Sequence, residues 1–254
     1  MALLIFKLGL TPALIGAATL VSRRWGPAIG GTLIALPLTS GPVLFFLALD
    51  HGPAFGVSAA TGSLAGTCGV AAFCLAYAWS ARRFEWPVAF GAACLAYVLV
   101  SLVVQAALGQ SIGLLLVVAV AIPIVSLTLM PKVLGTPVVI VAPWWDIPAR
   151  MAVGAALVAL ITEAAPSLGA QLSGLISTFP VFVTVLAVFT HRREGSWRVV
   201  QLMRGVLIGL FGTIAFFAIL RLSLEGIGIA AAFALGIGMA LGIQVFALRL
   251  IRTG

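Results

Sequence analysis

Residues 31–42 read GTLIALPLTSGP, and residues 174–182 read GLISTFPVF. In each segment a proline, Pro37 or Pro180, follows the first glycine by six positions. Each proline lies near the middle of a long apolar stretch, where it removes a backbone donor and frees a carbonyl of the preceding turn. A carbonyl freed inside a membrane must find a partner or line a polar cavity. The two segments therefore raise the same structural question.

Hydroxyl side chains flank the two prolines. Thr39 and Ser40 follow the first, and Ser177 and Thr178 precede the second. One interpretation is a simple proline kink in which hydroxyls satisfy the freed backbone groups. The other is a pair of broken helices whose interrupted ends form a substrate-binding site at mid-membrane, with the two prolines and these four hydroxyls as its candidate residues. Gly41 beside the first pair of hydroxyls favours a real break there.

The composition around these segments is that of a membrane protein. Of the 254 residues, 63% are hydrophobic and 8% are charged, and the mean hydropathy is +1.25. A soluble domain has about 25% charged residues. We therefore expect an all-α integral membrane protein embedded in the lipid bilayer.

The apolar stretches predict about nine transmembrane helices. Their approximate bounds are 3–21, 26–49, 53–79, 87–108, 111–129, 147–165, 168–190, 198–222 and 227–250. The segment 130–148 contains four prolines, so it is not expected to form one regular helix.

The basic residues lie as pairs at the ends of apolar stretches rather than on one face, so the net charge of +8 does not indicate a nucleic-acid partner. With the N-terminus outside, twelve of the fourteen Lys and Arg residues fall on the inner side, which the positive-inside rule favours. This pattern predicts a multi-pass protein with its N-terminus outside and its C-terminus in the cytoplasm, and the excess of Arg over Lys indicates a bacterial origin.

The chain also repeats itself. Residues 26–73 align without gaps to residues 169–216, a shift of 143 positions, and twelve of the 48 pairs are identical. All six glycines of the second window face a glycine of the first. The sequence therefore predicts a four-helix repeat in residues 1–110, a linker helix and Pro-rich connection in 111–146, and a second repeat in 147–254. Because an odd number of helices separates equivalent positions, the two repeats have opposite orientations (4+1+4).

Inverted repeats are typical of proteins that alternate between two openings. We therefore expect a secondary transporter for a small solute, an anion being one candidate, with its site between the second and seventh spans. A channel of the same architecture and a non-transporting membrane partner in envelope assembly remain open alternatives, and a homo-oligomer is possible. The sequence contains no catalytic set, so an enzyme is not expected.

Three charged residues are candidates for coupling or charge attraction. Glu163 lies near the outer end of the sixth span, and Lys7 and Arg150 occupy equivalent positions near the starts of the first and sixth spans. Alternatively, the carboxylate is a solvated helix end and the two cations reach the headgroups. His51 and His191 are interpreted as helix-end residues. Because the chain has no Cys/His cluster, we expect neither a metal site nor a cofactor.

Glycines recur at helical spacing in two predicted spans. The first set is Gly62, Gly66 and Gly69, and the second is Gly205, Gly209 and Gly212. Small residues on one face allow close helix approach. We therefore expect the third and eighth spans to pack together through these glycines.

The second repeat resembles the GlpM-type small bacterial inner-membrane proteins. The similarity rests on Gly174, Leu175, Phe179 and Pro180, and on the path that leads to His191. It covers about 80 residues, and the spacing of the histidine departs from the family pattern. The resemblance implies a fused duplication of a four-span unit and an inner-membrane location.

Overall fold

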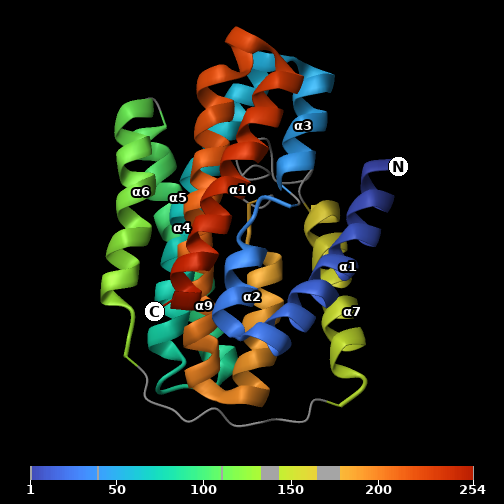
Figure 1. The fold of residues 1–254 in the computed structure, drawn as a ribbon, viewed down its shortest axis with the longest axis vertical. Helices are drawn as coiled ribbons and strands as arrows, with labels where there is room; N and C mark the ends of the chain where they lie inside the picture. Colours follow the sequence, from blue (N-terminus) through green and yellow to red (C-terminus); the bar gives the residue numbers. More distant parts are fainter. Residues whose placement is uncertain (1, 39, 110, 133–142, 165–177, 254) are drawn as a thin grey trace.

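The computed structural model describes residues 2–38, 40–109, 111–132, 143–164 and 178–253, with side chains described for 12–160 and 178–249 within these ranges. Throughout the described part of the chain the regular structure is α-helical, and no strand is found there. The helices form an elongated bundle (Figure 1). Their bounds are α1 Ala2–Trp25, α2 Pro27–Ile34, α3 Ser40–His51, α4 Pro53–Ser80, α5 Trp86–Leu108, α6 Ile112–Leu129, α7 Asp146–Ala164, α9 Val181–Ile227 and α10 Ile229–Thr253.

These bounds follow the apolar stretches of the sequence closely. Five helices, α4, α5, α6, α9 and α10, are long and apolar enough to cross a membrane by length and composition. The expected apolar stretch 168–190 lies partly outside the described residues, as does most of the Pro-rich connection 130–148. A membrane-embedded helical protein is therefore supported.

Four glycines of the described residues have a positive φ, and each lies between two consecutive helices. Gly26, Gly52, Gly195 and Gly228 have φ angles of 97°, 88°, 84° and 81°. Side-chain-bearing residues rarely adopt this region, so glycine is the residue that allows these reversals. One of them divides α9 into two helices, 181–194 and 196–227, which descend to the lower end in Figure 1 and return.

The lower end of the bundle gathers the basic residues. The end of α1, the α4–α5 connection, the start of α7 and the reversal within α9 all meet there (Figure 1). We call this the arginine-rich end; its basic residues are Arg23, Arg24, Arg82, Arg83, Lys132, Arg150, Arg192, Arg193 and Arg198. The opposite end contains the α3–α4 and α9–α10 connections, with Asp50 and Glu225 nearby.

Tryptophans also lie at the arginine-rich end. Arg24, Arg82, Arg193 and Arg198 stack on the rings of Trp25, Trp79, Trp145 and Trp197, with 4.9–5.8 Å between guanidinium carbon and ring centre. Tryptophan rings of this kind are typical of a membrane interface.

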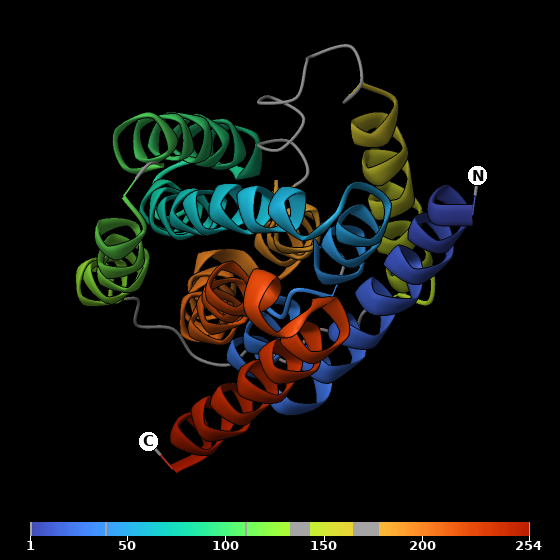
Figure 2. The same ribbon diagram turned by 90° about the horizontal axis from the view of Figure 1, so that it is seen from above.

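The centre of the bundle consists of α4 and α9, which lie between the other helices in Figure 2. About 61% of the apolar span of each is buried, against 28% for α5 and α10 and 22% for α6. The outer helices present large apolar side chains outward, such as Val103 on α5 and Val117 on α6, each 64% exposed. In water such a surface would favour aggregation, whereas lipid chains solvate it.

Candidate functional site

The first proline segment is a true helix break. Helix α2 ends at Ile34 and α3 begins at Ser40, with Pro37 half-buried between them. The carbonyl of Leu33, expected to be freed, accepts a hydrogen bond from the backbone N–H of Leu36 at 3.2 Å in a tighter turn. Thr39 lies outside the described residues. A broken helix, rather than a continuous kinked one, is therefore present in this segment.

Two side chains from distant helices bind the carbonyls at this break. The hydroxyl of Thr213 on α9 donates to the carbonyl of Ala35, and the Nε2 amide of Gln244 on α10 donates to the carbonyl of Thr32. Both donors are buried. The carbonyls at the end of α2 thus accept hydrogen bonds from side chains of the C-terminal half of the chain rather than from the hydroxyls that follow Pro37.

The second proline segment begins a helix. Pro180 is buried and directly precedes α9, and its carbonyl accepts the N–H of Thr184 at 2.9 Å. The hydroxyl of Thr178 is 2.9 Å from that of Tyr97 on α5, within hydrogen-bonding distance. Ser177 lies outside the described residues. Of the six candidate site residues, the structure therefore describes Pro37, Ser40, Thr178 and Pro180.

Gly66 and Gly209 of the glycine motifs pack against these two proline segments, called below the first and the second break, rather than against each other. A Cβ added at Gly66 on α4 would lie 2.4 Å from the Thr178 hydroxyl oxygen. One added at Gly209 on α9 would lie 2.5 Å from the Thr32 carbonyl and 2.6 Å from the Ala35 Cβ. Helices α4 and α9 do share a buried apolar cluster, but other side chains form it. The expected role of these glycines between the third and eighth spans is therefore not found.

The next glycines along each helix make a second pair of similar contacts. A Cβ at Gly69 would meet the backbone of Tyr97 and the side chain of Ser101, whereas one at Gly212 would meet Ala240 and Gln244. The contacting residues on α10 lie 143 positions after those on α5. Equivalent positions of the two halves thus make equivalent contacts.

Two buried polar atoms near the breaks have no hydrogen-bond partner within the described ranges. They are the hydroxyl oxygen of Thr184 and the Oε1 atom of Gln244, on side chains from residues 4% and 3% exposed. Buried polar groups are normally paired, since leaving one unpaired costs about 1–3 kcal/mol. These atoms are therefore candidates to contact a bound solute or water.

Sequence reasoning missed Tyr97 and Gln244. Each is a polar residue inside an apolar stretch, which is the one signal that could have drawn attention to them. Their partners, Thr178 and the carbonyl of Thr32, come from distant segments. Only the fold brings these groups together.

A second cluster surrounds Asp146 at the arginine-rich end. Its fully buried carboxylate binds Arg150 at 2.9 Å on the same helix, Arg193 at 2.9 Å on α9 and Arg23 at 2.5 Å on α1. Arg150 also pairs with Glu194 at 3.8 Å, and it is 3% exposed. It is therefore held among protein groups and does not reach outward toward headgroups or a free anion.

The environment of Asp146 keeps it ionised. Burial raises the pKa of this carboxyl group, but hydrogen bonds from Arg193, Arg150 and Arg23, together with the charge of Arg150, outweigh burial. The pKa is consequently held below its usual value. The side chains of the other two charged candidates, Lys7 and Glu163, lie outside the described residues.

His191 lies in the last turn of the helix 181–194, as the sequence predicted, and its side chain is buried there. Its Nδ1 atom is 3.5 Å from the hydroxyl of Tyr77 on α4. Nearer the second break, the rings of Phe73 and Tyr97 meet Phe179 edge-on, at 6.3 Å and 5.4 Å. An aromatic layer thus separates the second break from the histidine.

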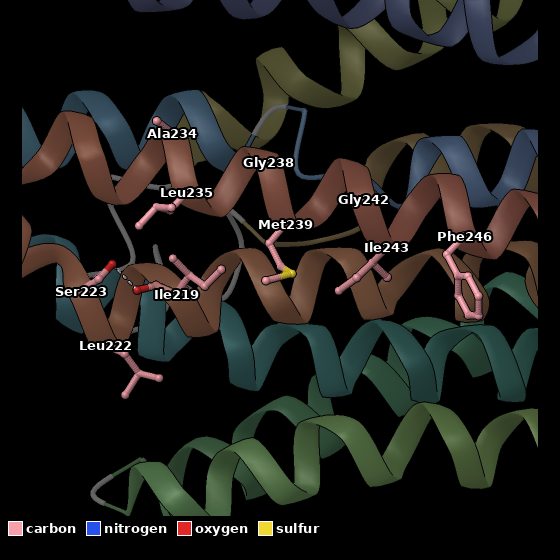
Figure 3. Close-up of a pocket in the computed structure, with 10 residues that line it drawn as sticks. All are labelled: Ile219, Leu222, Ser223, Ala234, Leu235, Gly238, Met239, Gly242, Ile243 and Phe246. Atoms are coloured by element: carbon pink, nitrogen blue, oxygen red, sulfur yellow. Dashed lines mark hydrogen bonds between the residues drawn. The ribbon is translucent and has the colours of Figure 1, made fainter.

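A hollow lies away from these segments, between the later half of α9 and α10. It has a volume of about 760 Å³, and Figure 3 shows it as a groove along the two helices. Apolar side chains such as Leu222, Met239 and Phe246 line it, and its one hydroxyl, from Ser223, bonds the backbone of Ile219 at 2.6 Å. These apolar side chains are more than half exposed, so the groove suits lipid chains rather than a polar solute.

In the described ranges no group of three or more His, Cys, Asp or Glu side chains could hold a metal ion. Comparisons with protein-family models, curated proteins and solved structures found no match. The resemblance to the GlpM-type proteins therefore stays a prediction, and the functional argument depends on the geometry of the two breaks.

Proposed function

We propose that this protein is a secondary membrane transporter of the inner membrane, with nine spans and a solute site between the two broken helices. The second span would comprise α2 and α3, and the seventh would end in the first half of α9. A transporter of this kind exposes one central site alternately to the two sides of the membrane.

The observation that carries the proposal is a reciprocal contact. Gly66 of the first repeat meets Thr178 at the break in the second, and Gly209 of the second repeat meets Ala35 at the break in the first. Position 178 follows position 35, and position 209 follows position 66, by the same 143 residues. Contacts that exchange partners in this way are expected for two repeats related by a two-fold axis.

Helix boundaries support the same relation. The reversals at Gly52 and Gly195 have nearly the same backbone angles, φ 88°, ψ 168° and φ 84°, ψ 179°. Helices α5 and α10 begin at Trp86 and Ile229, again 143 positions apart. Helix α6 has no counterpart, which fits a linker helix that gives the repeats opposite orientations.

The chemistry near the breaks favours an uncharged or zwitterionic polar solute over an anion. The described polar side chains there are neutral: Thr178, Thr184, Thr213, Tyr97 and Gln244. Of the two cations expected to attract an anion, Arg150 is already paired with carboxylates, and the side chain of Lys7 lies outside the described residues. Hydroxyl and amide groups recognise a solute through hydrogen bonds, and a site built to hydrogen-bond rejects analogues that lack the matching group.

Transport in proteoliposomes tests the proposal. Purified protein would be reconstituted, loaded with one unlabelled polar solute at a time, and assayed for uptake of the labelled form. We expect saturable exchange for one solute class, reduced at least tenfold by Gln244→Leu. The matched control is Ser58→Ala, because Ser58 is exposed and bonds only its own helix at 3.2 Å.

The outcomes separate the alternatives left open by the sequence. Electrical conductance without saturation would replace the transporter by a channel. No flux for any solute, together with copurification of a fixed partner, would favour a role in envelope assembly. Equal loss of exchange in the Gln244 and Ser58 variants would refute the assigned site.

A further inference from the structure

The ion pairs around Asp146 connect the two proposed repeats. Helix α1 belongs to the first repeat, whereas α7 and α9 belong to the second. Arg150 and Arg193 therefore bind Asp146 from within its own repeat, and Arg23 binds it from the other. Any relative movement of the repeats at this end must stretch the bond between Arg23 and Asp146.

The three arginines differ in their access to water. The side chain of Arg150 is 4% exposed, that of Arg193 is 22% exposed and that of Arg23 is 34% exposed. Arg23 also lies in the last turn of its helix. Water can thus replace the carboxylate around Arg23 more readily than around the other two.

The number of partners makes this bond reversible. A buried carboxylate with a single partner would be left as an uncompensated charge when that partner departs, which is strongly unfavourable. Asp146 keeps two arginines at 2.9 Å when Arg23 leaves. The bond can therefore open and close without leaving a buried charge unpaired.

We propose that the Arg23–Asp146 ion pair is a reversible latch that closes the arginine-rich, cytoplasmic side of the central path. This inference rests on the proposed function. The proposal rests on the position of this pair between the repeats. Arg23 is exposed to water, and Asp146 keeps two other arginine partners when Arg23 leaves.

Among the described residues, no equivalent cluster is found at the opposite end. A shift of 143 positions places Leu3 where the second repeat has Asp146, Asp50 where it has Arg193, and Pro166 where the first repeat has Arg23. The Arg23–Asp146 pair therefore has no counterpart at the equivalent positions of the other repeat, and it biases the resting protein toward closure at the arginine-rich end.

Cysteine accessibility tests the latch without knowledge of the solute. Cys94, the one half-buried native cysteine, is replaced by serine, and Ser40→Cys places a reporter at the first break. Cys68 and Cys74 are fully buried, and any labelling of these two cysteines is measured in each variant without the Ser40→Cys reporter. Labelling by a membrane-impermeant maleimide is then compared in everted vesicles and intact cells.

We expect Arg23→Gln to raise the labelling rate from the cytoplasmic face about fivefold and to lower it from the outer face, with Arg23→Lys in between. The matched control is Arg24→Gln, which removes the same charge from the same helix turn. Arg24 stacks on Trp25 but forms none of the ion pairs to Asp146. Monodisperse elution of each variant in detergent shows that the fold is intact.

Two results would overturn the latch in different ways. If the reporter reacts but Arg23→Gln labels at the same rate as Arg24→Gln, the latch is wrong and the transporter proposal stands. If the reporter reacts from neither face in any variant, no path reaches the break, and the proposed function fails together with the latch.

Discussion

The surroundings of Gly66 and Gly209 have the same geometry but different chemistry. Each glycine lets a helix approach the break of the other half, yet Gly66 meets a threonine side chain and Gly209 meets a backbone carbonyl and an alanine. At the second break the hydroxyl of Thr178 is within hydrogen-bonding distance of the hydroxyl of Tyr97 on α5. At the first break the backbone carbonyl of Ala35 accepts a hydrogen bond from the hydroxyl of Thr213 on α9. The close approach of two helices requires a glycine at both crossings. The side chains around the two glycines can differ without changing how the helices cross.

The largest effect is expected where a glycine meets backbone. A Cβ at Gly205 would lie 1.9 Å from the carbonyl oxygen of Ala28, so Gly205→Ala must push α2 and α9 apart. We expect a loss of about 3 kcal/mol in stability, measured by unfolding in detergent. Gly91→Ala is the control, because Gly91 is exposed and nothing described lies within 4 Å of its added Cβ. Equal loss in both variants would refute this crossing.

A smaller and reversible effect is expected at Gly66. The obstacle there is the side chain of Thr178, whose Oγ1 and Cβ would lie 2.4 Å and 2.7 Å from the added Cβ. Gly66→Ala should therefore cost about 1–2 kcal/mol, and Thr178→Gly, which removes both atoms, should restore at least half of it. At Gly209 the Thr32 carbonyl remains, so Ala35→Gly should not rescue Gly209→Ala. Double-mutant cycles on thermal unfolding measure the two couplings. If stability is restored equally at both sites, the obstacle is not a side chain at Gly66 and a backbone carbonyl at Gly209.

Gln244→Leu probes the amide that binds the first break. The variant leaves the Thr32 carbonyl without this donor but also removes an unpaired buried oxygen. We expect a net loss of about 1 kcal/mol on thermal unfolding, since these two changes oppose each other. Stabilisation by the leucine would mean that the amide is retained for solute binding alone.

The smallest effect is expected at the second break. Tyr97→Phe keeps the ring contact with Phe179 and removes the hydroxyl 2.9 Å from Thr178. A net hydrogen bond contributes about 1 kcal/mol, so we expect a loss of that size or less on thermal unfolding. Phe45→Leu, which removes a ring packed 5.0 Å from Phe233, should cost more. The reverse order would show that the hydroxyl pair is the stronger contact.

Much of the fold followed from simple signals in the sequence. Apolar length placed the helices to within a few residues, and Pro37 indicated where the second apolar stretch breaks. The glycine spacing correctly indicated close packing at Gly66 and Gly209 but not its partners. Helical periodicity reports which residues share a face, and it carries no information on which helix covers that face.

The sites depended on pairings between distant segments, which the sequence does not display. Asp146 adjoins the Pro-rich connection, and the arginines that bind it come from three helices. No local sequence motif therefore predicts the cluster. The sequence predicts that Arg150 reaches headgroups or an anion. Its burial arises because α9 packs against α7, and no local pattern in the sequence indicates this packing. Thr39, Ser177 and the side chain of Glu163 lie outside the described residues, so their roles stay predictions.

The placement of tryptophan has an optical consequence. All six tryptophans of the chain lie at or next to helix ends on the arginine-rich side: Trp25, Trp79, Trp86, Trp144, Trp145 and Trp197. The natural fluorescence of the unmodified protein therefore originates from one end of the bundle. A soluble quencher supplied to one side of sealed vesicles would thus report orientation directly, and changes in emission would report movement at the latch and not at the opposite end.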